Sequence, residues 1–522
     1  MTARDENLGY WCADAVAANP DRIAIVDLCG AAPRDVTYGD LERRLNQAAN
    51  LFTDAGLVPG DRLAMVVDNR TEFVEIMFGA MRAGVVPVPL STKLGAEVLR
   101  YILDDAACRA IVVEPRCSPI AAAVADEAEI EIRIALDTAP GTGWQLYEPA
   151  MERQSDGFSP PDLAADHPSF QPYTSGSTGR PKGVVLTHAG QLWWIRCVQK
   201  YWPSAPETRA LTAVPLYHKN AMAGAIKPLL LAGGMVVLLP NFEPRRFLEV
   251  LSAYRCTRTG AVPTVFTRLL QQHDLIETLD FSALESLSLG SAPVQKALME
   301  DVKKAFGCQV SESYGLTEGG PVMIGPPLDG RETPFGSCGV AWPEGKVKLM
   351  SPDGKEDPHY GDLWVKNPGV TPGYHNLPEV NASRIKDGWL ATGDLFSVDE
   401  DGFYYFRGRV DDMFNCGGEN IYPKEVENLL ITHPDIYDAS VVAVSQPVKG
   451  FVPVAMVMRL KGADITEQEL KQYCLDNGPA NAHPRRIRVV DELPLNTAAK
   501  VDRTAIRQIL EAAYADELAA AE

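Results

Sequence analysis

The sequence predicts an α/β fold with a large N-terminal domain of two helix-covered sheets and a small α+β C-terminal domain. From about residue 60 to 320, short apolar or β-branched runs alternate with longer segments whose apolar residues recur every three or four positions. After about Phe335 the strand-like pieces become shorter, and Gly, Pro and Asp separate them. From about Arg409, strand-like and helical segments are mixed over about a hundred residues, enough for an independent domain.

The first pattern predicts buried strands that helices connect. Parallel strands need long crossover connections, so this alternation favours parallel sheets covered by helices. The predicted strands are 62–67, 85–90, 109–114, 210–215, 235–239 and 284–289. The predicted helices include 71–83, 244–254 and 293–306.

The later patterns predict a β-barrel-like subdomain and then the C-terminal domain. The expected strands of the subdomain are 346–350, 362–367 and 403–407. The C-terminal domain is expected to contain strands 440–444, 452–460 and 487–490, with helices at 466–475 and from about 503. The apolar stretch 228–240 is shorter than the ~20 residues that a membrane-spanning helix needs. It predicts a helix end, a turn and a core strand, and no membrane span.

Composition excludes several classes of protein. The 522 residues leave room for about three domain-sized units, or for one large multi-layered unit plus a small one. A hydrophobic fraction of 46% and a charged fraction of 23% are typical of globular chains rather than disordered or collagen-like ones. The formal net charge of -20 has the wrong sign for a protein whose main partner is a nucleic acid or an anionic membrane. An anionic ligand would therefore need a local cluster of positive charge.

Cysteine and histidine spacing indicates neither a zinc site nor a redox motif. The 10 cysteines form no C-x-x-C pair, and the 8 histidines form no H-E-x-x-H motif. The first residues carry acids where a signal peptide would carry basic and then apolar residues. We therefore expect reduced thiols and a cytoplasmic protein.

A Gly/Ser/Thr-rich stretch at residues 173–183 predicts a phosphate-binding loop. Glycines allow backbone N–H groups to approach an anion, hydroxyls add donors, and Lys182 adds a positive charge. Pro181 precedes the lysine and Gly183 follows it, so the stretch is not the Walker motif of ordinary NTPases. A solvated turn is the alternative for a short loop of this kind, but eleven specified residues argue against it. The strand-like residues 184–186 follow the loop.

The loop and a series of later motifs resemble the adenylate-forming superfamily, which includes acyl-CoA synthetases, peptide-synthetase adenylation domains and luciferases. The later motifs occur in the order found in that superfamily, and the resemblance covers essentially the whole chain. They are residues 215–218, 290–293, 313–318, 361–365, 373–374, 388–394, 408–412, 417–423 and 496–503. The resemblance implies that a carboxylate attacks the α-phosphorus of ATP, and that a thiol then displaces AMP from the acyl adenylate.

The resemblance also assigns roles at the nucleotide. Lys500 would be the main catalytic cation, with Thr317 as a catalytic phosphate donor and Glu318 as the Mg²⁺ ligand. Asp394 and Arg409 would bind the ribose. This chain has Ala499 where the family usually has Gly. The implied ATP-binding residues are Thr174, Ser175, Gly176, Ser177, Thr178, Gly179, Lys182, Ser291, Ala292, Pro293, Ser313, Tyr314, Gly315, Leu316, Thr317, Asp394, Arg409 and Lys500.

The acyl pocket follows from the same resemblance. A gating or positioning role is expected for His218, because a carboxylate substrate is already ionised at neutral pH. The segment 219–224 contains no acid that could hold a substrate ammonium, which argues against an α-amino acid. Benzoate-type and chlorobenzoate-type CoA ligases look most similar, so an aryl or a short to medium apolar acid is expected. Lys219 and Asn220 would contact a polar group on the substrate or, for Lys219, point to the surface. The implied pocket residues are His218, Lys219, Asn220, Gly290 and Gly315.

The C-terminal part is expected to move during the reaction. The resemblance places a hinge at Asp411, between an N-terminal domain at 1–410 and a mobile C-terminal domain at 411–522. Gly417 and Gly418 would let the pantetheine arm of coenzyme A pass, and Arg485 would meet its phosphates, although a solvated charged face is an alternative. Many family members have a lysine soon after the hinge, where this chain has Asn415. A separate carrier protein as acceptor, a homodimer and a catalytically silent nucleotide-binding regulator remain open.

Overall fold

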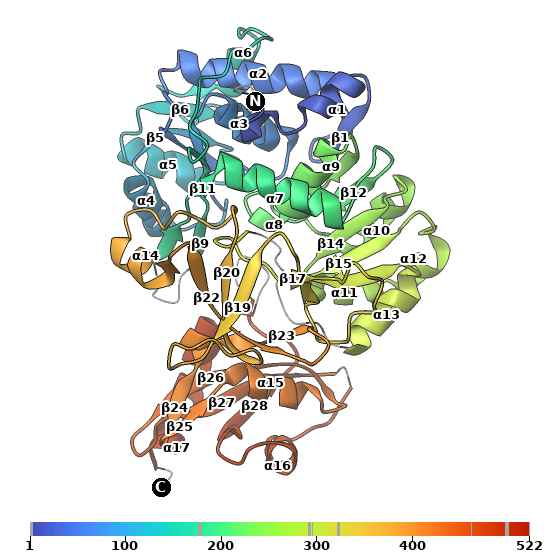
Figure 1. The fold of residues 1–522 in the computed structure, drawn as a ribbon, viewed down its shortest axis with the longest axis vertical. Coiled ribbons are helices and arrows are strands. Elements are labelled where there is room, and N and C mark those ends of the chain that lie inside the picture. Colours follow the sequence, from blue (N-terminus) through green and yellow to red (C-terminus); the bar gives the residue numbers. More distant parts are fainter. Residues whose placement is uncertain are drawn as a thin grey trace. The chain divides into compact units, whose positions relative to one another are not determined.

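The structure is a computed structural model, and it describes residues 4–175, 180–290, 294, 296–320, 324–460, 462–495 and 501–520. Two large sheets contain the strands that the sequence predicts near the N-terminus (Figure 1). The first sheet is parallel throughout, in the order β4 (Val86–Pro89), β3 (Arg62–Val66), β5 (Cys108–Val113), β6 (Ile132–Ala135) and β7 (Gln145–Leu146).

The second large sheet has seven strands, and only its last pairing, between β1 and β2, is antiparallel. Its order is β16 (Gln309–Glu312), β15 (Ser286–Leu289), β14 (Arg258–Ala261), β12 (Arg209–Thr212), β13 (Met235–Leu238), β1 (Ile23–Asp27) and β2 (Arg34–Thr37). The expected α/β class with parallel sheets is therefore confirmed.

Helices pack against these sheets. A capping box between Thr37 and Asp40 starts α2 (Tyr38–Asp54), which packs on α3 (Thr71–Arg82). Every residue of α3 is buried, so this helix lies inside the core rather than at its surface. The other helices of this part are α1 (Ala13–Ala18), α4 (Ala96–Asp105), α5 (Pro119–Glu127), α6 (Tyr147–Met151), α7 (His188–Tyr201), α8 (Lys219–Ala221), α9 (Lys227–Leu231), α10 (Pro244–Ala253), α11 (Pro263–Leu270), α12 (His273–Thr278), α13 (Lys296–Phe306), α14 (Pro378–Arg384), the 3-10 turn η1 (Leu8–Tyr10) and the π-helical turn η2 (Met222–Ile226).

Smaller β elements follow the second sheet. Strands β19 (Lys346–Met350), β20 (Tyr360–Lys366), β22 (Trp389–Val398), β21 (Ile385–Lys386) and β23 (Tyr404–Arg409) form a five-stranded sheet. In the described residues their pairings make an open sheet, so the expected barrel-like closure is not seen. The remaining short strands of this part are β8 (Pro168–Phe170), β9 (Tyr173–Ser175), β10 (Pro181–Gly183), β11 (Leu186–Thr187), β17 (Ile324–Gly325) and β18 (Val340–Ala341).

The C-terminal α+β domain has its own sheet and its own apolar core. Its strands are β24 (Phe414–Cys416), β25 (Glu419–Ile421), β26 (Ile436–Gln446), β27 (Gly450–Arg459) and β28 (Arg486–Val490). The 3-10 turn η3 (Val410–Asp412) precedes β24, and the helices are α15 (Pro423–Ile431), α16 (Glu467–Asn477) and α17 (Arg503–Ala520). Helix α16 begins with a capping box between Thr466 and Glu469, at the start that the sequence predicts.

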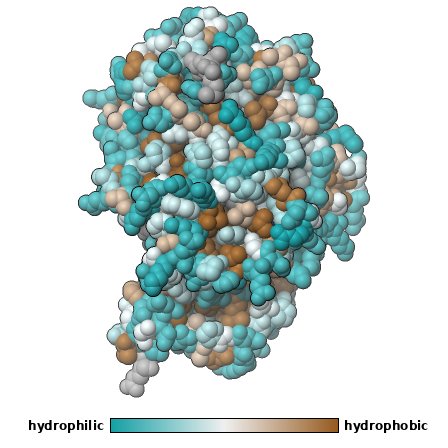
Figure 2. Space-filling model, viewed as in Figure 1, coloured by the Kyte–Doolittle hydropathy of each residue, from teal (hydrophilic) through white to brown (hydrophobic). Residues whose placement is uncertain are grey.

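Contacts divide the chain into two compact units. One comprises residues 1–332, 340–347 and 365–391, and the other comprises 333–339, 348–364 and 392–522. The predicted domain boundary at Asp411 stays a prediction. The face shown in Figure 2 is mostly hydrophilic, as a chain rich in acids leads one to expect. In the described residues, no helix combines the length and the apolar character that a membrane crossing requires.

Candidate active site

The Gly/Ser/Thr-rich loop connects the two strands of a short hairpin. Strands β9 and β10 pair in antiparallel fashion, with Thr174 opposite Lys182 and Tyr173 opposite Gly183. The expected strand at 184–186 is broken: Val184 forms a single bridge with Tyr374, and β11 begins only at Leu186. The reason is that the Gly183 carbonyl accepts a hydrogen bond from His375 instead of extending the hairpin. Gly176, Ser177, Thr178 and Gly179 lie outside the described residues.

Glu318 meets this hairpin and a third segment of the chain. Its Oε1 accepts a hydrogen bond of 3.1 Å from the hydroxyl of Tyr374 and lies 3.5 Å from Oγ1 of Thr174. The Lys182 ammonium lies 5.8 Å from the centre of the Tyr374 ring. Thr174 and Glu318 are 144 positions apart in the sequence. The fold therefore brings a carboxylate, a hydroxyl and a cation to the base of the predicted phosphate loop.

The other predicted motifs of this unit follow the carboxyl ends of parallel strands. Gly290 follows β15 and Ser313 follows β16, and Leu289 and Glu312 are paired at the ends of those strands. The segment that reaches His218 follows β12 of the same sheet. Ligands bind at this edge in open α/β sheets, so the fold collects these motifs where a ligand site is expected.

The segment 313–318 leaves the sheet and is held from two sides. Tyr314 donates its backbone N–H to Ile324 at 3.0 Å, and the Glu318 carbonyl accepts a hydrogen bond of 2.7 Å from Thr371. Gly315 is exposed, whereas Tyr314 and Leu316 are partly buried. Glu312, at the end of β16, was not predicted as a site residue, and burial raises its pKa to about 8.

Lys219 connects the predicted acyl pocket to the predicted nucleotide segment. Its Nζ donates to the carbonyl of Thr317 at 2.6 Å and to that of Leu316 at 3.3 Å. The lysine is 9% exposed, which contradicts the alternative that it points to the surface. Burial lowers the pKa of Lys219 to about 7, and the negative charge of Glu318 opposes that shift. His218 directly precedes α8, and its ring lies beside that of Tyr217, with 4.7 Å between ring centres.

Asp394 and Arg409, the predicted ribose-binding residues, are neighbours on adjacent strands. They lie opposite each other in the pairing of β22 with β23, and an Arg409 nitrogen is 3.5 Å from Oδ1 of Asp394. Asp394 is 7% exposed, and its backbone N–H donates to the Thr392 hydroxyl. Both residues belong to the C-terminal compact unit. Their closeness requires the β22–β23 pairing, which the sequence motifs alone do not reveal.

Gly417 and Gly418 form the tight turn between β24 and β25. Their φ angles are +63° and +99°, a left-handed conformation that side chains rarely adopt. Gly417 donates its N–H to the carbonyl of Lys449, and Gly418 donates to Oδ1 of Asn415. The turn by itself therefore requires glycine, and their predicted contact with coenzyme A stays a prediction. Asn415 caps this turn through that hydrogen bond.

Arg485 points back onto its own loop. Its guanidinium donates to the carbonyl of His483 at 2.6 Å and to that of Asn481 at 3.4 Å. The loop borders a cavity of about 260 Å³ between α15 and α16, which Tyr422, Leu429 and His483 help to line. The residues that line this cavity are far in the sequence from the hairpin and Glu318. The candidate site is therefore defined by the contacts around Glu318 and not by the size of a cavity.

Several predicted residues cannot be placed. Lys500, Ser291, Ala292 and Pro293 lie outside the described residues, and so does the side chain of Asn220. Asp411 lies in the 3-10 turn η3. Among the residues that are described, no three His, Cys, Asp or Glu side chains form a group that could hold a metal ion. A magnesium ion that arrives with a nucleotide needs only one carboxylate, because phosphates and waters supply its other ligands. Glu318 fits that requirement.

Tyr374 is the site residue that the sequence did not assign. It is 4% exposed. Its hydroxyl donates a hydrogen bond to Glu318, and the Lys182 ammonium lies over its ring. Its position next to Gly373 in one of the motifs was the only signal in the sequence. A tyrosine in a motif is as readily a core residue, and only packing shows its contact with Glu318.

Comparison with known proteins places the chain in a family. The profile of the family described as "AMP-binding enzyme" matches residues 12–375, and that of the "AMP-binding enzyme C-terminal domain" matches 425–500. A feruloyl-CoA synthase from Amycolatopsis sp. is 33% identical over 97% of this chain and 99% of its own. A 3-hydroxybenzoate–CoA ligase from Aromatoleum sp. (strain CIB) is 29% identical over 98% of this chain and 97% of its own.

Solved structures agree with this. ATP-bound MatB from Rhodopseudomonas palustris has a TM-score of 0.88 and is 31% identical, over 97% of this chain and all of its own. The similarity covers both the large N-terminal part and the small C-terminal part. With the geometry of the hairpin and Glu318, these matches lead to one conclusion: the chain belongs to the AMP-binding enzyme family, the adenylate-forming enzymes.

Proposed function

We propose that this protein is an ATP-dependent acyl-CoA synthetase. A carboxylate oxygen of the acid bonds to the α-phosphorus of ATP as the bond to pyrophosphate breaks, which gives an acyl adenylate. The thiol of coenzyme A then bonds to the acyl carbon, and AMP leaves. The observation that carries the proposal is the meeting of Thr174, Glu318 and Tyr374 at the base of the Gly/Ser/Thr-rich loop.

The proposed roles follow from charge. Acid and triphosphate are both anions, so fixed cations must offset the charge that develops as they react. Lys182 and Lys500 supply those cations, and the hydroxyls of Thr174 and Thr317 donate to phosphate oxygens. Asp394 and Arg409 hold the ribose. Glu318 would hold Mg²⁺, which when bound neutralises phosphate charge, and Tyr374 keeps its carboxylate in place.

An aryl acid is the favoured substrate. Both relatives named above are CoA ligases of aromatic acids by their names. In this chain the segment 219–224 carries no carboxylate to bind an ammonium group, so an α-amino acid is disfavoured. His218 positions the acid beside the α-phosphate and needs no proton transfer to do so, because the acid is ionised at neutral pH.

The test is exchange of labelled pyrophosphate into ATP in the presence of a panel of carboxylic acids, followed by thioester formation with coenzyme A. Acid-dependent exchange is expected in the wild type. Its absence with every acid would contradict the proposal and favour a nucleotide-binding regulator. Exchange without thioester formation on coenzyme A would instead favour a separate carrier protein as acceptor.

Lys500→Ala should separate the two half-reactions. We expect adenylate formation to fall by a factor of about 10² to 10³, because a positioned cation that stabilises transition-state charge contributes about that much. Thioester formation from synthetic acyl adenylate should remain largely intact, since the lysine would act in only one arrangement of the C-terminal domain. Equal loss of both steps, measured by rapid quench, would contradict this division of roles.

Asp411→Pro tests the proposed hinge. Proline restricts φ at the position expected to rotate, so thioester formation should decrease more than adenylate formation. The same two assays measure this. If both half-reactions continued at the wild-type rate, the hinge would have to lie elsewhere.

A further inference from the structure

Lys219 is a buried cation close enough to Glu318 for the two charges to attract each other. It is 9% exposed, and in the part of the chain that the structure describes it forms no ion pair. Two of its N–H groups are directed at the carbonyls of Leu316 and Thr317. Protonated lysine has three donors, so one donor remains available. Burial of a charge that no ion pair neutralises costs free energy, and Glu318 attracts this charge only from a distance.

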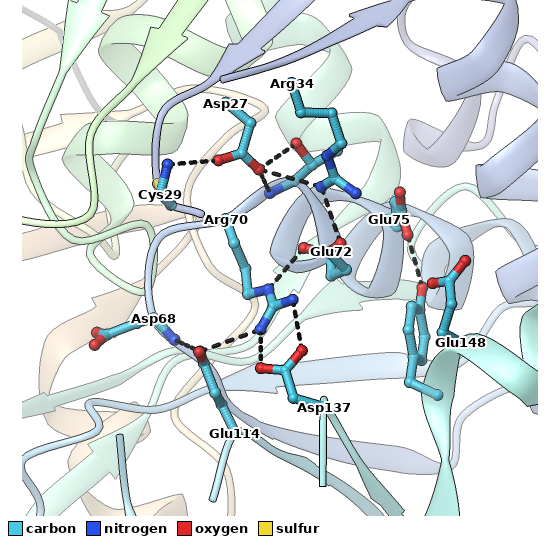
Figure 3. Close-up of polar contacts among 12 residues, drawn as sticks. Asp27, Cys29, Arg34, Asp68, Arg70, Glu72, Glu75, Glu114, Asp137 and Glu148 are labelled. Atoms are coloured by element: carbon cyan, nitrogen blue, oxygen red, sulfur yellow. Dashed lines mark hydrogen bonds and ion pairs between the residues drawn. The ribbon is translucent and has the colours of Figure 1, made fainter. Parts of the chain in front are cut away.

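Buried arginines of the same unit are matched by acids. Figure 3 shows that Arg70 contacts Glu72, Glu114 and Asp137, with nitrogen to oxygen distances of 2.7, 3.2 and 2.8 Å. Arg44 pairs in the same way with Glu75 and Glu148. The chain is thus able to neutralise buried charge with its own carboxylates, whereas Lys219, like Lys227, forms no ion pair with the described residues.

The segment after Lys219 borders open space. Gly224 is exposed although residues 221–223 and 225–230 are buried, and a Cβ atom added there would meet no atom within 4 Å. A Cβ atom added at Gly290, which follows β15, would also meet no atom within 4 Å. A π-helical turn, η2, includes Gly224, and π-turns in helices are frequent at functional sites. The segment that carries Lys219 therefore has open space beside it at Gly224.

We propose that Lys219 determines acid specificity by binding a second oxygen acceptor, a phenolic hydroxyl or a second carboxylate, on the acid that is activated. This inference rests on the proposed function, because it assigns the acid to the segment after His218. The backbone contacts to Leu316 and Thr317 hold the ammonium at the border between acid and nucleotide. Its remaining N–H then donates to the substituent, whose partial or full negative charge neutralises the lysine.

The experiment compares paired acids on one enzyme sample. Benzoate is compared with 3- and 4-hydroxybenzoate in a phenol arm and with isophthalate in a carboxylate arm. The readout is the ratio of kcat/KM between substituted and plain acid in pyrophosphate exchange, which does not depend on the fraction of folded enzyme. The wild type should prefer the substituted acid in one arm by about tenfold or more, because a site built to bind a polar group discriminates against its absence.

Lys219→Met should abolish that preference and bring the ratio close to one. Lys219→Arg should retain part of it, since arginine keeps a donor and a charge. The matched control is Lys227→Met, which removes another buried lysine from the same segment. Lys227 donates to Gln191 and lies against the Trp194 ring, so its loss should leave the ratio unchanged.

Two outcomes would overturn the inference while the proposed function stands. One is a ratio that is the same in the wild type and in Lys219→Met. The other is an equal decrease of kcat/KM for all acids, which would make Lys219 only a support for the segment 316–317. No acid-dependent exchange in the wild type would overturn the proposed function and this inference together.

Discussion

Buried charge is treated in opposite ways in two regions of the large unit. In the network around α3, arginines and carboxylates form several ion pairs, and Figure 3 shows those of Arg34 and Arg70 with Glu72. Beside the candidate site, Lys219 and Lys227 are buried with hydrogen bonds to carbonyl oxygens, and neither forms an ion pair with the described residues. Their pKa values are both lowered by burial, that of Lys219 to about 7.

The two regions differ in whether they can accept another charged group. Burial alone would raise the pKa of Asp27, but hydrogen bonds from Cys29 and Thr71 hold it below its usual value, so the acid stays charged. Such saturated contacts give a region no capacity for another charged partner. At Lys219 the opposite holds, because in the described residues its ammonium contacts only carbonyl oxygens, and Glu318 attracts its charge without an ion pair. The acid-binding site proposed above would need a cation that the protein's own carboxylates leave without an ion pair.

Removal of one cation from the saturated network should have the largest effect on stability. In Arg70→Met, Glu72 and Glu114 lose their shared partner and keep only Arg34 and Arg116 respectively, so we expect a loss of about 3 kcal/mol in the free energy of unfolding, at the low end for a broken buried pair. Urea denaturation measures it. Arg100→Gln is the control, because the Arg100–Asp104 pair is exposed and is expected to contribute about 0.5 kcal/mol. Similar losses of stability in the two variants would show that the buried network contributes no more than an exposed ion pair does.

The buried ammonium of Lys219 should change how the stability of the protein depends on pH. Its pKa in the folded protein is about 7, below the usual 10.5, so the charge destabilises the fold fully below pH 7 and less as the pH rises toward 10.5. The stability of Lys219→Met relative to the wild type should therefore decline by about 2 kcal/mol between pH 7 and pH 9. Urea denaturation at the two pH values checks this. A difference that does not change with pH would mean that Lys219 titrates as an exposed lysine does.

Tyr374→Phe should have the smallest effect and act on the site alone. It removes one hydrogen bond to the Glu318 carboxylate and keeps the ring beneath Lys182. A hydrogen bond to a charged group contributes about 1.5 kcal/mol, so kcat/KM for MgATP should fall about tenfold. A titration with Mg²⁺ should show weaker activation in the variant. Unchanged Mg²⁺ dependence would mean that Tyr374 belongs to the core rather than to the site.

Local patterns were sufficient to predict most elements. The start of α16 at Thr466 and Glu469, and the end of the helix before Gly233 and β13, follow from capping and turn chemistry that act over a few residues. A phosphate-binding role for the Gly/Ser/Thr-rich stretch follows from its composition alone and stays a prediction. The strand at 184–186 was placed incorrectly, since its hydrogen bonds depend on Tyr374 and His375 far along the chain.

By itself, the sequence determined the α/β class, the order of the motifs and the types of chemical group available, because apolar periodicity and motif spacing are local properties. Tertiary structure decided which of those groups meet. It brought Glu318 to Thr174 and Tyr374, paired Asp394 with Arg409, and buried Lys219 against the carbonyls of residues 316 and 317. The physical reason is that the burial of a side chain and the charges around it depend on residues distant in the sequence. A lysine in the sequence therefore does not reveal whether an acid will pair with it.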